Sequence, residues 1–234
     1  MKTSKVFAFL LALLTALVVL TGSIAVPLLC RPFYYAQIGP LGLTSTGLTQ
    51  EEIQQAYDDV MDYCLGLRED FAAGILPFSQ SGASHFADVR VLFVLDLWVL
   101  GLSLAALAAA FVYCRRRRVR PQLLLGHGPG FWAAVGLGAV FLVIGGLAAL
   151  DFQRAFVVFH SIFFPGKSNW LFDWQTDPII LLLPEAFFRN CALLIFGLLI
   201  LWCAVLIGAD LWAGKRRRKQ TPPLPSCSGC PGCQ

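Results

Sequence analysis

Long apolar runs separated by shorter polar segments set the pattern of this chain. A helix of about 20 apolar residues is long enough to cross a bilayer, and four runs reach that length, at residues 6–29, 91–114, 131–150 and 187–212. Backbone N–H and C=O groups cannot stay unpaired in lipid, so each run is predicted to be a helix. The pattern therefore predicts an all-α integral membrane protein with four transmembrane helices.

The first run also has features of a secretory signal peptide. Lys2 and Lys5 precede it, and Ser23-Ile24-Ala25 resembles a small-residue cleavage site. The apolar core of a signal peptide has about 7–15 residues, and this run is longer. We therefore interpret it as a retained membrane anchor, which also gives an even number of spans.

The distribution of charge predicts the orientation of the spans, because basic residues are retained on the cytoplasmic side of a membrane. With four spans, 12 of the 18 Lys and Arg residues fall on one side and 12 of the 14 Asp and Glu residues on the other. Both termini of this multi-pass cell-membrane protein are therefore expected in the cytoplasm. Residues 30–90 and 151–186 are expected to form a polar and aromatic extracytoplasmic cap made of two loops.

The two strongest basic runs, 115–118 and 215–219, each follow directly on a predicted span. Topology signals and contacts with anionic lipids explain such runs, so no nucleic-acid partner is expected. Residues 1–214 are predicted to form one membrane domain and residues 215–234 a flexible cytoplasmic tail. Three tail cysteines lack a fourth metal ligand, and a palmitoylated or reduced tail stays open as an alternative.

In the first predicted outer segment, Thr49 and Glu52 have the spacing of a capping box, which predicts a helix over residues 50–65. Apolar residues recur along it at helical spacing, with aspartates on the other side, so the helix is expected to be amphipathic and to lie over the mouth of the bundle. Tyr57 on this helix is a candidate for substrate contact or for interfacial anchoring.

His85 begins the richest group of ionisable residues, just before the second span. In a helix, His85, Asp88 and Asp96 fall on one stripe. Asp88 is then a candidate to orient His85, as a carboxylate does in many acid–base sites, or to pair with Arg90 at the entrance to the helix. Asp96 is expected to serve helix packing. Ser79, in the loop that precedes the helix, is a further candidate.

The second predicted outer segment is dense in aromatic residues, which is typical of a membrane interface. It places His160 about one turn before the break at Pro165-Gly166. Arg154 and Trp170 are supporting candidates on either side. Asp173 and Asp177 either close over the histidines or cap the last helix, and the sequence leaves both interpretations open.

Other chemistries lack their usual motifs. The outer segments contain no His-Glu-x-x-His or related metal spacing, so no metal or other cofactor is expected. No Gly-x-Ser-x-Gly motif occurs, and no outer cysteine neighbours a histidine, which argues against a serine or cysteine nucleophile. Cys30 and Cys64 could form one structural disulfide but not an exchange relay. His127 is interpreted as a residue of the turn between the second and third spans.

Two long motifs surround the histidines. One reads Phe78-Ser79-x-x-Gly82-x-x-His85-Phe86-x-Asp88-Val89. The other reads Phe159-His160-x-x-Phe163-Phe164, followed by Trp170-x-Phe172-Asp173-x-x-x-Asp177-Pro178 and Leu183-Pro184-Glu185-x-Phe187-Phe188. With the four-span plan, these motifs resemble the lipoprotein intramolecular transacylase (Lit) family of Gram-positive bacteria. The resemblance covers roughly residues 1–212 and leaves out the tail.

The resemblance implies an acyltransferase whose partner is a diacylated lipoprotein within the bilayer. The sn-2 acyl chain of the diacylglyceryl-cysteine would move to its own α-amino group, giving a lyso-form lipoprotein. The nucleophile would then belong to the substrate, with His85 and His160 in acid–base and oxyanion duties and Asp88 orienting His85. A metal-dependent membrane lipid hydrolase and a non-catalytic membrane scaffold stay open as alternatives, and the sequence leaves the oligomeric state undetermined.

Overall fold

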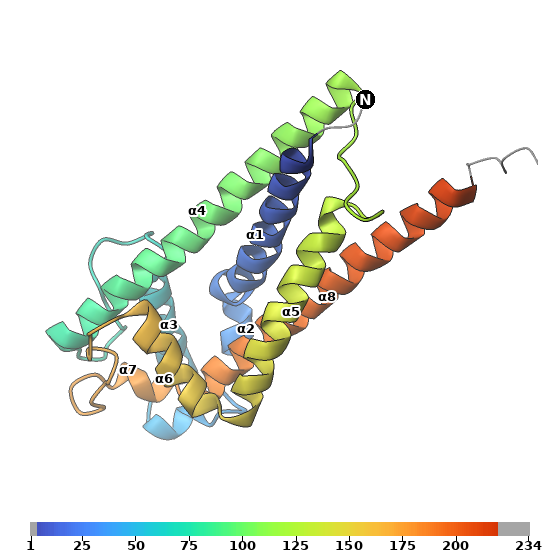
Figure 1. The fold of residues 1–234 in the computed structure, drawn as a ribbon. Helices are drawn as coiled ribbons and strands as arrows, with labels where there is room; N and C mark the ends of the chain where they lie inside the picture. The colour runs from blue at the N-terminus through green and yellow to red at the C-terminus, as the bar shows by residue number, and fades with distance from the viewer. Residues whose placement is uncertain (1–3, 220–234) are drawn as a thin grey trace, which may run out of the picture.

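The computed structural model describes residues 4–219 and is built from helices (Figure 1). In chain order the helices are α1 (Lys5–Leu29), α2 (Arg31–Tyr35), the 3₁₀ helix η1 (Leu43–Thr46), α3 (Gln50–Cys64), α4 (Gln80–Arg117), α5 (Pro129–Leu150), α6 (Phe152–Phe163), α7 (Ile179–Leu182) and α8 (Glu185–Lys219). Within residues 4–219 no strand is formed, and an isolated bridge joins Leu124 and His127 in the turn before α5.

Four helices, α1, α4, α5 and α8, are long and apolar enough to cross a membrane, so the prediction of an all-α protein with four such helices is confirmed. They run in one general direction, and α1 packs against each of the other three (Figure 1). Most side chains along α4, α5 and α8 are not buried by protein, including Trp98, Leu142 and Leu193. Such an apolar surface needs lipid around it.

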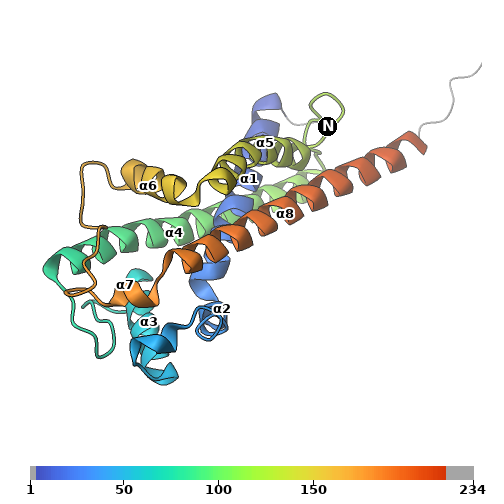
Figure 2. The same cartoon turned by 90° about the horizontal axis from the view of Figure 1, so that it is seen from below.

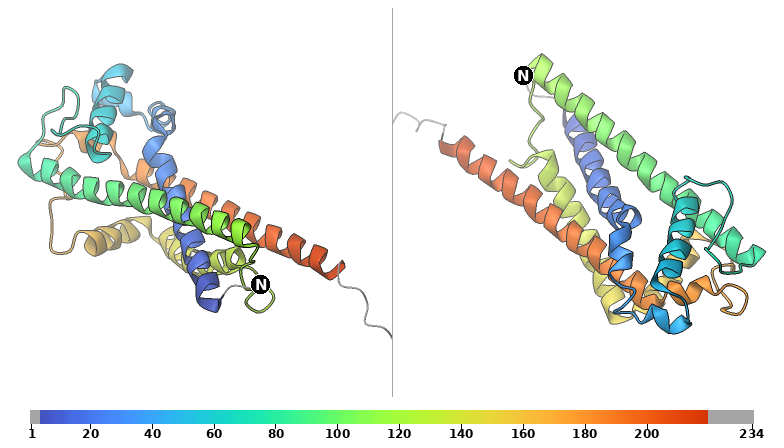
Figure 3. Two further views of the ribbon diagram at one scale, coloured as in Figure 1. Left: turned by 90° about the horizontal axis from the view of Figure 1, so that it is seen from above. Right: turned by 180° about the vertical axis from the view of Figure 1, so that it is seen from behind.

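The short helices gather at one end of the bundle. Figure 1 shows α2, α3, α6 and α7 at the end opposite the N-terminus, and Figure 2 shows α6 and the α3–α7 pair on opposite sides of α4. The chain after α6 passes the first turns of α4 to reach α7, as the left view of Figure 3 also shows. This end of the bundle is called the helical cap below.

The helical cap owes its core to α3. Thr49 and Glu52 form the predicted capping box at its start. Its buried residues are the ones that recur at helical spacing in the sequence: Ile53, Ala56, Tyr57, Val60, Met61 and Cys64. They pack with side chains of α2, α4, α7 and α8 in one apolar cluster. The amphipathic helix predicted from residue 50 is therefore confirmed.

The second span is longer than its apolar run predicts. Helix α4 has 38 residues, which is about 57 Å at 1.5 Å per residue and exceeds a hydrocarbon core of about 30 Å. The helix is capped by Ser79, and its first turns include His85. These turns therefore project into the helical cap. Of the flexible tail predicted for residues 215–234, residues 215–219 continue α8 as helix, and residues 220–234 lie outside the described residues.

Candidate functional site

His85 of α4 and His160 of α6 lie close together in the helical cap, although 75 residues separate them in the chain. Their ring centroids are 5.8 Å apart, and the ring planes are inclined by 32°. Both side chains are buried, with 5% and 7% of the residue exposed. Two imidazoles at this spacing disfavour a state in which both carry a positive charge.

The hydrogen bond at His160 fixes the tautomer of its ring. Nδ1 lies 2.8 Å from the carbonyl oxygen of Phe156, one helical turn earlier. Because a carbonyl oxygen only accepts, Nδ1 must carry the hydrogen, and Nε2 keeps its lone pair. Burial lowers the pKa of His160, against a smaller opposing effect of the bond to Phe156. The structure thus holds an oriented imidazole that favours its neutral form.

Aromatic rings surround the histidine pair. Trp170 stacks on His160 with centroids 4.6 Å apart, and Phe156 packs at 4.2 Å. Phe164 and Phe172 meet His85 edge-on, at 5.0 and 5.5 Å. Phe164 also contacts His160, at 5.6 Å, and so joins the two rings. The rings exclude water and leave few polar atoms to compete for the imidazole nitrogens.

His85 keeps one nitrogen unused. Its Nδ1 is buried and has no hydrogen-bond partner among the described residues. A buried polar atom without a partner is costly, so a native structure needs a reason to hold one. A group of a bound substrate would supply the missing partner.

Asp88 bonds to the segment after α6. Its carboxylate accepts hydrogen bonds from Lys167 Nζ and, at 3.1 Å, from Asn169 Nδ2, and no hydrogen bond joins it to His85 Nδ1. Burial alone would raise the pKa of Asp88, but the hydrogen bonds from Lys167 and Asn169 outweigh it, and the net pKa lies below its usual range. The same two bonds anchor the chain that carries Trp170 to α4.

Ser79 and Asp177 form a second anchor between these segments. The backbone N–H and the hydroxyl of Ser79 each donate to the Asp177 carboxylate at 2.7 Å, and Thr176 Oγ1 donates to it at 2.8 Å. Burial raises the pKa of Asp177, but these three donors outweigh it, and the net pKa lies below its usual range. Ser79 Oγ also accepts from Gly82 N at 2.9 Å and caps α4.

The other candidates from the sequence do not contact the histidine rings. Arg154 is exposed, and Asp173 is exposed with Oδ1 accepting from the N–H of Gln175. Tyr57 is buried in the core of the helical cap, where it stacks on Tyr34 at 3.7 Å. Asp96 Oδ2 is buried in α4 without a partner among the described residues.

Three residues at the site were not singled out from the sequence, namely Phe156, Lys167 and Asn169. Phe164 and Phe172 were named there as positions of the second motif, without a role at the histidines. One had a usable signal, because Lys167 is the only lysine between Lys5 and Lys215. Phe156 had none, since the whole segment around it is rich in phenylalanine. Hydrogen bonds between residues about 80 positions apart leave no trace in a single sequence.

The structure also places the side chains that could ligate a metal and the two cysteines predicted in the outer segments. Among residues 4–219, no three His, Cys, Asp or Glu side chains gather closely enough to hold a metal ion. Cys30 and Cys64 are both free, Cys30 exposed and Cys64 buried. Burial raises the pKa of the Cys64 thiol to about 12, so it stays protonated near neutral pH.

His127 lies at the end of the bundle opposite the helical cap. It belongs to the turn between the second and third spans, as predicted, and it also contacts α8. Its Nδ1 lies 2.7 Å from Asp210 Oδ2 of α8, and Asp210 Oδ1 accepts from Gly128 N at 2.9 Å. The turn before α5 is therefore tied to α8.

Comparisons with known proteins agree on one family. The model of the family described as lipoprotein intramolecular transacylase Lit matches residues 9–188. The structure of that transacylase from Bacillus cereus superposes with a TM-score of 0.82 at 21% identity, covering 92% of this chain and 97% of that one.

Two variants of the Bacillus cereus protein, in which a histidine is replaced by alanine or by arginine, also match. The alanine variant has a TM-score of 0.74 at 20% identity and covers 92% of this chain and 95% of its own. The arginine variant has a TM-score of 0.68 at 22% identity and covers 91% and 94%. No curated protein matches the chain.

Proposed function

The chain belongs to the lipoprotein intramolecular transacylase family, a family of membrane acyltransferases, and we propose that His85 and His160 carry its reaction. The acyl chain at the sn-2 position of a diacylglyceryl-cysteine moves to the α-amino group of the same cysteine. The product is a lyso-form lipoprotein with an amide-linked chain. The reaction needs no cofactor.

One observation supports this assignment above the others. Two imidazoles from different helices are buried at 5.8 Å, and one of them has a nitrogen without a partner among the described residues. A scaffold has no need for such a costly arrangement. The paired rings suit a reaction that takes a proton from one atom and gives a proton to another.

The chemical step balances without water. The neutral α-amine attacks the carbonyl carbon of the sn-2 ester, so a C–N bond forms as the carbonyl becomes an oxyanion. The ring that acts as base takes a proton from the nitrogen. When the C–O bond breaks, the glyceryl oxygen receives a proton and leaves as a hydroxyl. Because amine and ester belong to one substrate molecule, holding them together beside the histidines would make an enzyme nucleophile unnecessary.

The geometry favours His160 as the base. Its Nδ1–H is held by Phe156, so Nε2 presents a lone pair in a fixed direction. His85, whose Nδ1 has no hydrogen-bond partner within residues 4–219, then hydrogen-bonds the oxyanion or the leaving oxygen. Asp88, Ser79 and Asp177 act as positioning residues, because they fix the segment that carries Trp170 to the start of α4.

We place the site at the extracytoplasmic face. The helical cap lies at the end of the bundle opposite the N-terminus (Figure 1). Arg115–Arg118 lie at the end of α4 away from the cap, and basic residues are retained in the cytoplasm. A lipoprotein whose lipid lies in the outer leaflet could then reach the histidines from the membrane.

The test uses purified protein and a synthetic diacyl lipopeptide. Mass spectrometry should show an unchanged mass together with a blocked amino terminus. His85→Asn and His160→Asn should each lower the rate by about 10²–10⁴, the usual contribution of general acid–base catalysis. His127→Asn is the matched control, since His127 lies at the other end of the bundle, and it should stay within a few-fold of the native rate.

Two results would contradict the proposal. Full activity in both single variants would remove the histidines from the mechanism. Release of a free fatty acid that a chelator abolishes would indicate a metal-dependent hydrolase, because transacylation should survive chelation.

A further inference from the structure

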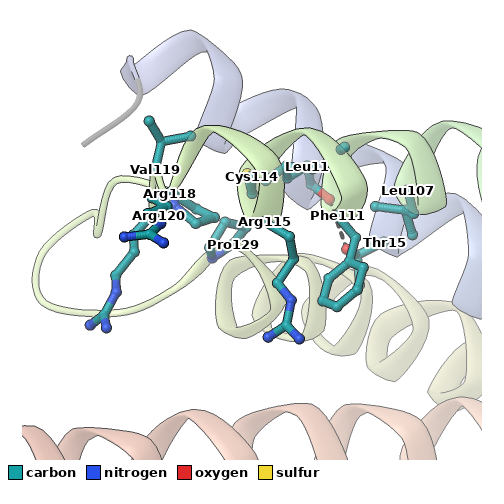
Figure 4. Close-up of a pocket in the computed structure, with 12 residues that line it drawn as sticks. Leu11, Thr15, Leu107, Phe111, Cys114, Arg115, Arg118, Val119, Arg120 and Pro129 are labelled. Carbon is teal, nitrogen blue, oxygen red and sulfur yellow. Dashed lines mark hydrogen bonds between the residues drawn. The ribbon is translucent and has the colours of Figure 1, made fainter. Parts of the chain in front are cut away.

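A hollow of about 560 Å³ opens at the end of the bundle opposite the helical cap. It lies between the first turns of α1, the last turns of α4 and the chain that leads to α5 (Figure 4). None of its lining residues belongs to the histidine site. Its volume is in the range of about 300–1,000 Å³ that is usual for small-molecule and lipid-like ligands.

The floor of the hollow is apolar. Leu11 of α1 faces Leu107, Ala110 and Phe111 of α4. Thr15 brings the one hydroxyl, and it donates to the carbonyl oxygen of Leu11 at 2.7 Å, a bond drawn in Figure 4. Since that hydroxyl is already used, the floor suits a hydrocarbon chain better than a polar ligand.

The mouth of the hollow is strongly basic. Arg118 has a left-handed backbone conformation with φ of 51° and ends α4, so the chain turns and brings Arg120 to the same opening as Arg115. None of the three guanidinium groups forms an ion pair with a carboxylate among residues 4–219. Figure 4 shows their side chains reaching out beyond the helices.

The spacing of floor and mouth fits one leaflet. Leu107 precedes Arg118 by 11 residues on α4, which is about 16 Å along a helix, close to half of a hydrocarbon core of about 30 Å. A phosphate at the arginines would lie at headgroup level, while a chain on the floor would reach about to the bilayer midplane.

We propose that this hollow is a binding site for an anionic glycerophospholipid. The phosphate lies among Arg115, Arg118 and Arg120, and one acyl chain lies on the floor formed by Leu11, Leu107 and Ala110. The Arg115 guanidinium lies 5.6 Å from the centre of the Phe111 ring, and none of the three arginines has a carboxylate partner among residues 4–219. Three positive charges beside an apolar groove select for a molecule that has both a negative charge and a hydrocarbon chain. The site is separate from the reaction and would bind lipid as a structural ligand.

The test measures lipid binding to the purified full-length protein in an uncharged detergent, by native mass spectrometry. Phosphatidylglycerol is the probe, and it should bind saturably. Phosphatidylcholine, which has no net charge, and glycerol 3-phosphate, which has no chain, should each bind at least about tenfold more weakly if charge and hydrocarbon are both recognised.

Matched variants separate the hollow from general surface charge. Arg118→Gln/Arg120→Gln should weaken phosphatidylglycerol binding about tenfold or more. Arg116→Gln/Arg117→Gln removes the same charge from exposed residues of the same run that do not line the hollow, and should change binding less than about threefold. Ala110→Trp fills the floor and should also weaken binding while all three arginines remain.

Three results would contradict the proposed lipid site or change its ligand. Equal weakening by the two arginine pairs, or equally tight binding of phosphatidylcholine, would overturn the site. Glycerol 3-phosphate binding as tightly as the lipid would show that the arginines hold a free phosphate anion instead. If Ala110→Trp fails to fold, as judged by its circular dichroism and melting temperature, the two arginine pairs still decide.

Discussion

At the scale of single residues, the two histidines differ in what holds them. The ring of His160 is fixed by a hydrogen bond to Phe156 and by stacking against Trp170. His85 is held by edge-on aromatic contacts, and its Nδ1 has no partner among the described residues. One ring is thus preset in direction and tautomer, while the other is free to bond what enters. This difference is the physical basis for giving them different roles.

The lowered pKa of His160 predicts a pH profile. The α-amine of a peptide has a pKa of about 8, so log kcat/KM should fall with a slope of one below that pH. Burial lowers the pKa of His160 from its ordinary 6.5, so the base should take up a proton, and the rate should fall for this second reason, only below pH 6.5. The profile of the native protein should therefore steepen toward a slope of two at a pH clearly below 6.5.

The free energy of unfolding should also decrease as the pH falls. Below pH 6.5 the unfolded chain binds a proton that folded His160 resists, so the native state loses stability as the pH falls through this range. The profile is measured with a diacyl lipopeptide in native protein and in His127→Asn, which should keep its shape. A steepening at or above pH 6.5 would contradict a buried neutral His160 in the reactive form.

Residue types were more predictable than residue partners. His85, His160 and Asp88 stood out because ionisable residues are rare beside membrane spans, and the structure does bring the two histidines together. The helical stripe placed Asp88 beside His85, yet the carboxylate bonds to Lys167. Helical spacing gives the direction of a side chain within one helix. It does not show that Lys167, 79 positions away, will bind the Asp88 carboxylate once the chain has folded.

At the scale of elements, the segment between α6 and α7 is held against the start of α4 by partly buried hydrogen bonds between Asp177 and Ser79. Asp177 lies so close to Gly82 that a β-carbon there would overlap its carboxylate. Glycine is therefore required by the approach of another segment, while its conformation is ordinary helix. This contact predicts a sharp difference between two glycines of the same helix.

Gly82→Ala should push Asp177 away from Ser79 and break the two hydrogen bonds that Ser79 donates to this charged group. Each such bond contributes about 1.5–3 kcal/mol, so we expect a loss of at least about 2 kcal/mol in the free energy of unfolding and a strong loss of transacylation. Thermal unfolding in detergent and the lipopeptide assay measure the two effects.

Gly101→Ala is the matched control, because nothing lies within 4 Å of a β-carbon at that position of α4. Alanine favours helix over glycine by about 0.5–1 kcal/mol, so this variant should be as stable as the native protein or slightly more stable. Equal behaviour of the two variants would mean that Asp177 does not hold the segment to α4.

The long helices followed from the sequence because one strong constraint decides them. Lipid leaves no partner for backbone groups, so an apolar run of sufficient length has to be helical. The amphipathic helix α3 was as clear, since its capping box and its stripe agree. The loop after α6 was not predictable, because its path depends on bonds such as Asp177 to Ser79, 98 positions apart.

At the scale of the whole molecule, the two ends of the bundle differ in chemistry. The helical cap holds the buried histidines and most aspartates, while the other end holds Arg115–Arg118 and the hollow with its arginine mouth. Basic residues are retained in the cytoplasm, so this polarity predicts one orientation in the membrane. The cap should face out, and the termini should face in.

Two single cysteine substitutions test that orientation directly. Ser168→Cys lies in the exposed loop of the cap, and Arg116→Cys lies exposed at the end of α4. In intact cells a membrane-impermeant maleimide should modify Ser168→Cys but not Arg116→Cys, and both should react after permeabilisation. Peptide mass spectrometry distinguishes the new cysteines from the native ones. Labelling of Arg116→Cys alone in intact cells would mean that the protein has the opposite orientation. The histidine site would then lie on the cytoplasmic side, where the outer-leaflet lipid of a lipoprotein could not reach it.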